Sequence, residues 1–186
     1  LALSTELGAG AGKTPAAVDA VRLNPGEKLR IAVLGCGNRS QAHIQAVNAC
    51  ADRMEIVALC DILPEQMEQK KRLLKSAAPR CYTDYSRMLQ EADIHAVAVV
   101  LPNTLHRAAA IASLEAGKHV LCEKPLTLKL ADTKAIIAAS DRTRRIVQVG
   151  TQSRHSPGYA ALAAKLSQGL IGPVMYGWAQ TFRQDW

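Results

Sequence analysis

The chain has 186 residues, of which 48% are hydrophobic and 21% are charged. This length fits one domain and part of another, and the composition excludes disordered and fibrous proteins. The net charge is +7, but no aromatic side chains stand between the clustered basic residues to stack on bases, so we expect no nucleic-acid partner. Glycine and proline interrupt the longest charge-free run, and we expect no membrane span.

The cysteines give no sign of a metal site or a disulfide framework. The five of them form no CxxC pair and match no zinc spacing: Cys36, Cys50, Cys60, Cys81 and Cys122. Cys60 and Cys122 lie within apolar runs, which is typical of buried free thiols. We therefore expect free thiols and no metal.

Both ends of the chain suggest a piece of a longer protein. Residues 1–28 are rich in Ala, Gly and Pro without apolar periodicity, which predicts an extension ahead of the fold. The localisation stays open: cytoplasmic by default, periplasmic if residues 1–12 are the end of an export signal. Four of the seven aromatic residues crowd into the last eleven positions, at Tyr176, Trp178, Phe182 and Trp186, and the chain begins with Leu1.

Short β-branched runs alternate with amphipathic stretches from Leu29 onward. The sequence predicts strands at Leu29–Leu34, Glu55–Cys60, Cys81–Tyr82, His95–Leu101, His119–Cys122 and Ile146–Val149. Helices are expected between them, with Pro64 in a first turn and Gly117 as a stop. Strands separated by helices predict an α/β fold over residues 29–152, a doubly wound parallel Rossmann sheet.

The pattern changes after Gly150. Residues 156–168 read as a helix, and apolar side chains then alternate from Val174 to Phe182 as in a strand with one packed face. We expect residues 153–186 to begin a second domain. The late aromatics more readily fit a strand packed on helices than a wall that stacks on sugars.

A glycine-rich turn follows the first strand, at Gly35-Cys36-Gly37-Asn38-Arg39-Ser40. The first glycine permits a tight turn, the second lets the backbone approach a pyrophosphate, and the next helix offers free N–H groups to phosphates. Ser40 stands where Gly or Ala is usual. Such a turn can also be purely structural, but its place between a strand and a helix favours dinucleotide binding.

Asp61 ends the second predicted strand, 21 residues after Ser40. A carboxylate there accepts hydrogen bonds from adenosine ribose hydroxyls and repels a 2′-phosphate. The alternative is a helix N-cap before Pro64. Arg39 complicates the choice, because a nearby arginine can hold a 2′-phosphate. We expect NAD as the cofactor, with NADP less favoured.

Three segments together resemble the glucose-fructose oxidoreductase, inositol dehydrogenase and rhizopine-catabolism (Gfo/Idh/MocA) family. They are Gly35-Cys36-Gly37 with Asp61, the run Leu101-Pro102-Asn103-Thr104-Leu105-His106, and Gly117 to Pro125, whose Glu-Lys-Pro is the most specific part. The resemblance runs from about Leu29 to Trp186. It implies that the Rossmann domain is followed by an α/β substrate domain with a mostly antiparallel sheet, truncated in this chain, which often mediates oligomers. We therefore expect a homo-oligomer formed through that domain.

The glycine motif and the resemblance together imply cofactor contacts at Gly35, Gly37, Asn38, Arg39, Ser40, Asp61, Leu101, Pro102, Asn103, His106, Glu123, Lys124 and Gln152. Lys124 is the expected catalytic group, because its amine can hydrogen-bond a developing alkoxide; the alternative is a solvated surface lysine. His106 is either a contact beside the cofactor or a helix-start residue with a local hydrogen bond. His155 is expected to be structural, and we assign no role to His43, His95 or His119.

The resemblance implies an NAD-dependent oxidoreductase that transfers a hydride to or from a carbinol carbon of a sugar, polyol or keto-sugar. Two alternatives remain: an NAD-using glycosidase that oxidises C3 transiently, although such enzymes usually depart from Glu-Lys-Pro, and a dinucleotide-binding module without turnover. The family's later Asp and His have no counterpart in the sequence. We therefore expect this chain alone to be inactive.

Overall fold

The computed structural model describes residues 19, 21–75, 78–152, 156–178 and 180. The chain divides into two compact units, Leu1–Gly150 and Thr151–Trp186, which are described separately below. Within the described residues, no helix is long and apolar enough to cross a membrane. Residues 1–18, the start of the expected N-terminal extension, lie outside the described residues. They include residues 1–12, where the end of an export signal was considered.

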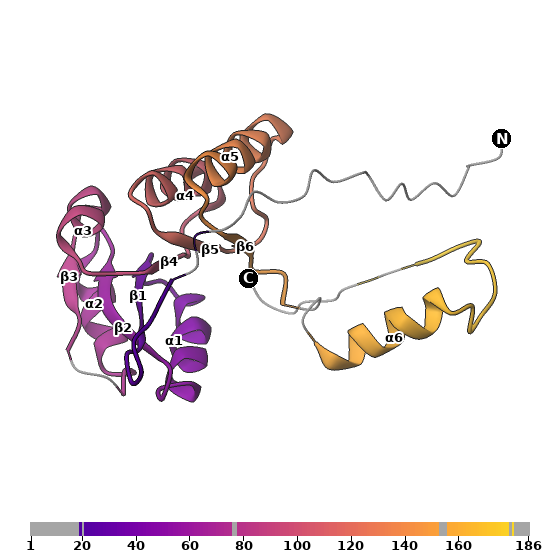
Figure 1. Cartoon of the computed structure of the whole chain (residues 1–186), viewed down its shortest axis with the longest axis horizontal. Coiled ribbons are helices and arrows are strands. Elements are labelled where there is room, and N and C mark those ends of the chain that lie inside the picture. The colour runs from indigo at the N-terminus through magenta and orange to yellow at the C-terminus, as the bar shows by residue number, and fades with distance from the viewer. Residues whose placement is uncertain (1–18, 20, 76–77, 153–155, 179, 181–186) are drawn as a thin grey trace. The chain divides into compact units, whose positions relative to one another are not determined.

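The first unit contains a six-stranded parallel sheet with the order β3-β2-β1-β4-β5-β6 (Figure 1). Its strands are β1 (Leu29–Leu34), β2 (Met54–Cys60), β3 (Arg80–Tyr82), β4 (Ala96–Val99), β5 (His119–Cys122) and β6 (Val147–Val149). Its helices are α1 (Ser40–Ala49), α2 (Pro64–Lys71), α3 (Tyr85–Glu91), the 3-10 turn η1 (Asn103–Leu105), α4 (His106–Glu115) and α5 (Leu130–Thr143). The doubly wound Rossmann sheet expected from the sequence is confirmed.

Strand β4 is shorter than the sequence predicts. It ends at Val99 rather than Leu101. Pro102 has no N–H to offer a neighbouring strand, so the ladder cannot continue through it, and the chain turns into η1. The early end of β4 leaves Leu101 and Pro102 outside the sheet, beside the turn that follows β1.

The carboxyl ends of the strands lie level with one another. The register pairs Leu34 with both Cys60 and Val99, Val99 with Cys122, and Cys122 with Val149. The residues that follow these strand ends therefore lie along one edge of the sheet. The strand order reverses between β1 and β4, and ligands of doubly wound sheets bind at this edge beside that reversal.

One face of the sheet carries the larger core. Leu34, Val99 and Val120 belong to a buried cluster that also includes Met88 of α3 and Leu114 of α4. Helices α4 and α5 pack against each other, and Figure 1 shows them side by side over one part of the sheet. Packing on this face holds in place the strands whose carboxyl ends form the edge described above.

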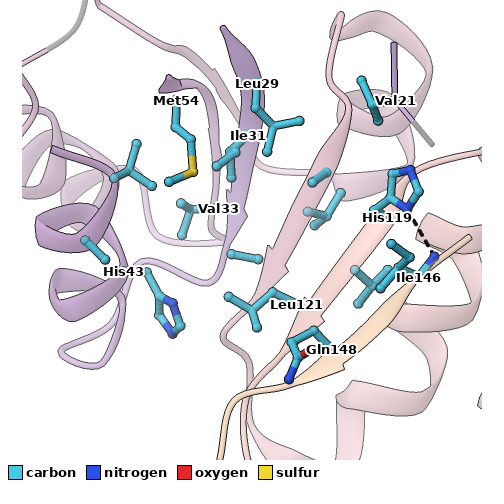
Figure 2. A pocket seen from close by; sticks show the side chains of 16 residues that line it. Val21, Leu29, Ile31, Val33, His43, Met54, His119, Leu121, Ile146 and Gln148 are labelled. Atoms are coloured by element: carbon cyan, nitrogen blue, oxygen red, sulfur yellow. Dashed lines mark hydrogen bonds between the residues drawn. The ribbon is translucent and has the colours of Figure 1, made fainter. Parts of the chain in front are cut away.

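On the opposite face, helices α1 and α2 contribute to the core within the first unit. There, a smaller buried cluster joins Val33 and Ile56 to Ile44 of α1 and Met67 of α2. Beside α1 runs an apolar groove of about 520 Å³, lined in part by alternate residues of the strands, such as Leu29, Ile31 and Val33 of β1 and His119 and Leu121 of β5 (Figure 2). His43 of α1 lies at the edge of this groove.

The second unit contains helix α6 (Pro157–Ser167), with Ser156 at its N-cap and proline in its first turn. No residue of this helix is buried. Val174 to Trp178 form no strand, although their side chains alternate as expected, because a strand needs a neighbour for its backbone hydrogen bonds. The expected strand extends to Phe182, which lies outside the described residues, as do His155 and Trp186.

Candidate functional site

The two glycines of the turn after β1 serve different structural needs. Gly35 has a φ of +95°, and a Cβ atom there would lie 2.3 Å from the carbonyl oxygen of Val100. Only glycine fits that position, because an L side chain is strained at such a φ and would collide with backbone. A Cβ on Gly37 would meet nothing within 4 Å, so this glycine faces open space.

The start of α1 offers unpaired donors to an anion. Ser40 is buried, and its hydroxyl donates to the carbonyl oxygen of Gly37 over 2.6 Å. Gly37, Asn38 and Arg39 are exposed, and no described residue accepts their backbone N–H groups. Free N–H groups at a helix N-terminus form an anion site, so this turn fits a pyrophosphate.

Asp61 joins the end of β2 to the glycine-rich turn. One carboxylate oxygen accepts from the backbone N–H of Cys36 at 2.7 Å, and the other accepts from the N–H of Leu63 at 2.9 Å. The N-cap of α2 is Leu63, so Asp61 does not cap this helix. Its bond to the N–H of Leu63 instead closes a turn just before the helix. Each carboxylate oxygen has a second lone pair, which leaves acceptor capacity for a ligand hydroxyl.

A cavity of about 550 Å³, which we call the Asp61 cavity, lies between the turn after β1, the end of β2 and the start of η1. Five residues expected to contact the cofactor line it: Gly35, Gly37, Asp61, Leu101 and Pro102. Apolar side chains such as Ile62, Leu63 and Leu105 make up much of the rest. Among the described residues that line it, Asp61 and Asp84 carry charge and none is basic.

Arg39 is directed to the end of β5. Its Nε donates to the Glu123 carboxylate at 2.7 Å, and it does not line the Asp61 cavity. The possibility that Arg39 holds a 2′-phosphate therefore receives no support from its position. The ion pair instead links the glycine-rich turn to the Glu-Lys-Pro segment.

Glu123 is only 5% exposed and collects three hydrogen bonds. Oε1 accepts from Arg39 and, at 2.8 Å, from Nε2 of His43, and Oε2 accepts from the backbone N–H of Lys124 at 3.1 Å. Burial tends to raise the pKa of this carboxyl group, but the hydrogen bonds from Arg39, His43 and Lys124 outweigh it, so the pKa is lowered from its ordinary value. We call Arg39, His43, Glu123 and Lys124 the Glu123 cluster.

Lys124 follows Glu123 and is exposed. Its side chain has no ion-pair partner among the described residues, which leaves its amine available to a ligand. The peptide bond between Lys124 and Pro125 is cis. The backbone N–H of Lys124 donates to Oε2 of Glu123, whereas its side chain forms no ion pair with any described residue.

His106 is fully buried at the start of α4, and its ring lies between two carbonyl oxygens. Nδ1 is 2.9 Å from the oxygen of Pro125, and Nε2 is 2.8 Å from the oxygen of Leu101. These contacts favour the hydrogen-bonding interpretation of His106 over a direct cofactor contact. One of these contacts is not local: it places α4 beside the residue after Lys124.

Two other expected contacts are Asn103 and Gln152. Asn103 is exposed in η1 and does not line the Asp61 cavity. Gln152 belongs to the second unit and is exposed. The sequence reasoning gave no role to His43, although one signal was present: Arg39 and His43 are four residues apart, and side chains at that spacing share one side of a helix.

Comparison with known proteins identifies the first unit. Residues 29–151 match the model of an oxidoreductase family described as having an NAD-binding Rossmann fold. Inositol 2-dehydrogenase from Salmonella typhimurium is 31% identical over 149 residues, which are 79% of this chain and 44% of that protein. An inositol 2-dehydrogenase/D-chiro-inositol 3-dehydrogenase from Lacticaseibacillus casei is 33% identical over 145 residues, 77% of this chain and 42% of the relative. The chain thus spans less than half the length of these curated relatives.

Solved structures give the same result. The WlbA dehydrogenase from Bordetella pertussis, in complex with NADH and UDP-GlcNAcA, superposes with a TM-score of 0.73 at 30% identity, over 78% of this chain and 44% of that one. A 3-ketoreductase from Actinomadura kijaniata, in complex with NADP, gives a TM-score of 0.71 at 25% identity, over 79% of this chain and 44% of that one. Similar folds therefore carry either nicotinamide cofactor.

Proposed function

We propose that this chain, which belongs to the Gfo/Idh/MocA family of oxidoreductases, is the cofactor-binding part of an enzyme that transfers a hydride between NAD and a carbinol carbon of a sugar, polyol or keto-sugar. The observation that carries the proposal is the placement of three groups along one sheet edge. The free N–H groups before α1, the Asp61 carboxylate and the Lys124 amine all follow strand ends that the register holds level. The relatives that act on inositol and on nucleotide sugars support a polyhydroxylated substrate.

Each group has a distinct task. The N–H groups of the glycine-rich turn bind the pyrophosphate, and the Asp61 carboxylate accepts hydrogen bonds from the adenosine ribose hydroxyls. NAD, when bound, supplies the hydride acceptor. The Lys124 amine takes up the hydroxyl proton of the substrate and stabilises the negative charge that builds on that oxygen before the hydride passes to the cofactor.

Two features support NAD over NADP. The described wall of the Asp61 cavity has no basic side chain to pair with a 2′-phosphate, and the Asp61 carboxylate repels one. Arg39, the nearest candidate in the sequence, pairs with Glu123 instead. The NADP bound by the 3-ketoreductase makes this preference a point to test.

Titration of the 186-residue chain with NADH and NADPH, followed by calorimetry, tests the cofactor assignment. We expect NADH to bind at least about 10-fold more tightly, because an unpaired 2′-phosphate beside a carboxylate costs more than 1.4 kcal/mol. Equal affinities would overturn the preference for NAD. Binding of neither cofactor would overturn the assignment of the site.

Lys124→Ala, made in the longest form of the protein that its gene encodes, tests the catalytic assignment. Inositols and nucleotide sugars serve as the substrate panel, with NADH formation as the readout. We expect turnover to fall about 100-fold or more, as for loss of an oxyanion donor, with NADH affinity within about threefold. Unchanged turnover would reject Lys124. Release of an aglycone from glycosides without accumulation of NADH would favour the glycosidase alternative. Two further expectations, assembly into a homo-oligomer and inactivity of this chain alone, stay predictions.

A further inference from the structure

The residues around Glu123 are arranged as a support for the backbone of Lys124. The carboxylate divides its acceptors: Oε1 takes the two side-chain donors, Arg39 and His43, and Oε2 takes the N–H of Lys124. Oε1 is held by the side chains of Arg39 and His43 at the start of α1. Oε2, the other oxygen of the same carboxylate, is thereby directed toward the N–H of Lys124, just after β5. Loss of a donor at Oε1 frees the carboxylate to rotate, and the bond to Lys124 then lengthens.

The two donors are not equivalent. The Arg39 side chain is 43% exposed and lies beside the free N–H groups of the turn, where an anionic ligand competes for its guanidinium. The His43 side chain is 15% exposed and projects from α1 toward the sheet, as Figure 2 shows. Because His43 is less exposed than Arg39 and lies one turn further into α1, we expect it to keep its bond to Glu123 if a ligand draws Arg39 away.

The surroundings leave the carboxylate little room to move. A Cβ on Gly150 would lie 3.4 Å from both Cα and Cδ of Glu123, so the start of the β6 loop packs closely against this side chain. The N–H of Glu123 also bonds to the carbonyl oxygen of Val99. The backbone of Glu123 is thus tied to β4 and its side chain packs beside Gly150, while the donors at Oε1 restrain rotation of the carboxylate.

We propose that His43 is a positioning residue for Lys124: through its hydrogen bond to Glu123 it fixes the backbone of Lys124, and so the origin of the lysine side chain, independently of Arg39. The consequence for catalysis rests on the proposed function of Lys124. The role of His43 in holding the Lys124 backbone does not depend on that function.

Amide hydrogen exchange in the 186-residue chain, followed by NMR, tests the positional claim. His43→Leu removes the donor, whereas His43→Gln keeps an N–H near the place of Nε2. Gln45→Leu, at an exposed position of α1, is the matched control. We expect the Lys124 N–H to exchange about 10-fold faster in His43→Leu, as for loss of a hydrogen bond worth about 1.4 kcal/mol, and to return within about threefold of wild type in His43→Gln. The N–H of Val33, in the middle of the sheet, reports global opening and should not change.

Three outcomes would overturn the proposal: unchanged exchange at Lys124 in His43→Leu, equal acceleration at Val33, or failure of His43→Gln to restore protection. Turnover provides a second measurement in the longest form of the protein. We expect His43→Leu to lower kcat about 10-fold with the KM for NAD within about threefold, because the cofactor site is intact while the amine is displaced. If the wild-type chain does not bind NADH, the proposed function fails, yet the exchange result still decides the role of His43.

Discussion

The Asp61 cavity and the Glu123 cluster lie along the same sheet edge but are built on opposite principles. The cavity is mostly apolar, and the charged residues among the described ones that line it are Asp61 and Asp84. The cluster is a network of hydrogen bonds on the buried Glu123 carboxylate, and one of its donors is the backbone N–H of the exposed Lys124. We propose the first region as a ligand site and the second as a support for Lys124. Substitutions should therefore affect binding at the first and placement or stability at the second.

The glycine-rich turn is the physical link between the two regions. Cys36 in this turn donates to Asp61, and Arg39 at its end donates to Glu123. A change that distorts the turn should therefore damage both regions at once, whereas a change within either region should leave the other intact.

Gly35→Ala should have the largest effect, because it strikes this shared turn. The new methyl group would combine a φ of +95° with a contact of 2.3 Å to Val100. We expect the free energy of unfolding to fall by about 3 kcal/mol or more, measured by urea denaturation, with loss of NADH binding. Gly37→Ala is the control: its methyl group meets no described atom within 4 Å, so stability should stay within about 1 kcal/mol while NADH affinity falls. Equal stability of the two variants would contradict this account.

Asp61→Asn should come next, and its effect should be on binding. Loss of a charged acceptor should weaken NADH binding about 10- to 100-fold and NADPH binding less, measured by calorimetry. Asp84→Asn provides the comparison within the same cavity. Its carboxylate accepts from the N–H of Ser86 at the start of α3, so this variant should lose up to about 1 kcal/mol of stability with NADH affinity unchanged. If both variants lose NADH affinity alike, Asp61 has no special role.

Glu123→Gln should act on the pH dependence of stability. The pKa of Glu123 is lowered in the folded state, so its charge stabilises the fold above the ordinary value of 4.5, and this contribution is lost as the pH falls through the folded pKa. We expect the wild-type chain to be the more stable at pH 7, with the difference shrinking below pH 4.5 in thermal unfolding curves. Glu65→Gln, at an exposed position, should show no such trend. A difference that is constant from pH 7 to pH 3 would refute the assignment.

Labelling of thiols should give the smallest effect and reports on packing at both regions. Burial raises the pKa of Cys36, Cys60 and Cys122 to about 12, and all are free thiols. Because the thiolate is the reactive form, we expect iodoacetamide at pH 8 to modify the exposed Cys81 in the native chain and to spare these three. Mass spectrometry identifies the sites. Rapid labelling of Cys122 alone would indicate that the Glu123 cluster opens more easily than the turn beside the cavity.

Local patterns were enough to predict most of the fold. The bounds of β1 and β5 agree with the sequence analysis, because β-branched runs bounded by a glycine or a charged turn leave little freedom. Strands β2 and β6 differ by one residue at their starts, and β4 ends early at Val99. The alternation after Val174 was misleading in the described residues, since a pattern of side chains cannot supply a partner strand.

The site was less accessible to sequence reasoning wherever it depends on contacts between distant elements. Gly35 and Asp61 could be found because a motif places them after strands. The bond between His43 and Glu123 joins residues 80 apart, and it exists because β1 and β5 flank β4 with their ends level. The bond from His106 to Pro125 likewise depends on how α4 packs beside β5. The four-residue spacing of Arg39 and His43 indicated that their side chains share one side of α1. Only the strand order shows that Glu123 is the partner of both.

Because the strand ends are level, the candidate site lies at one edge of the sheet, whereas the turns that lead into the strands lie at the opposite edge. Asp61, Glu123 and Gly35 each follow a strand by one position, whereas the short turn at residues 51–53 enters β2 at the opposite edge. A reporter domain inserted between Ala51 and Asp52 would therefore lie away from the proposed dinucleotide site while remaining joined to β2, whose other end borders that site. The same geometry that gathers the site at one edge makes the other edge a place to build a nicotinamide sensor.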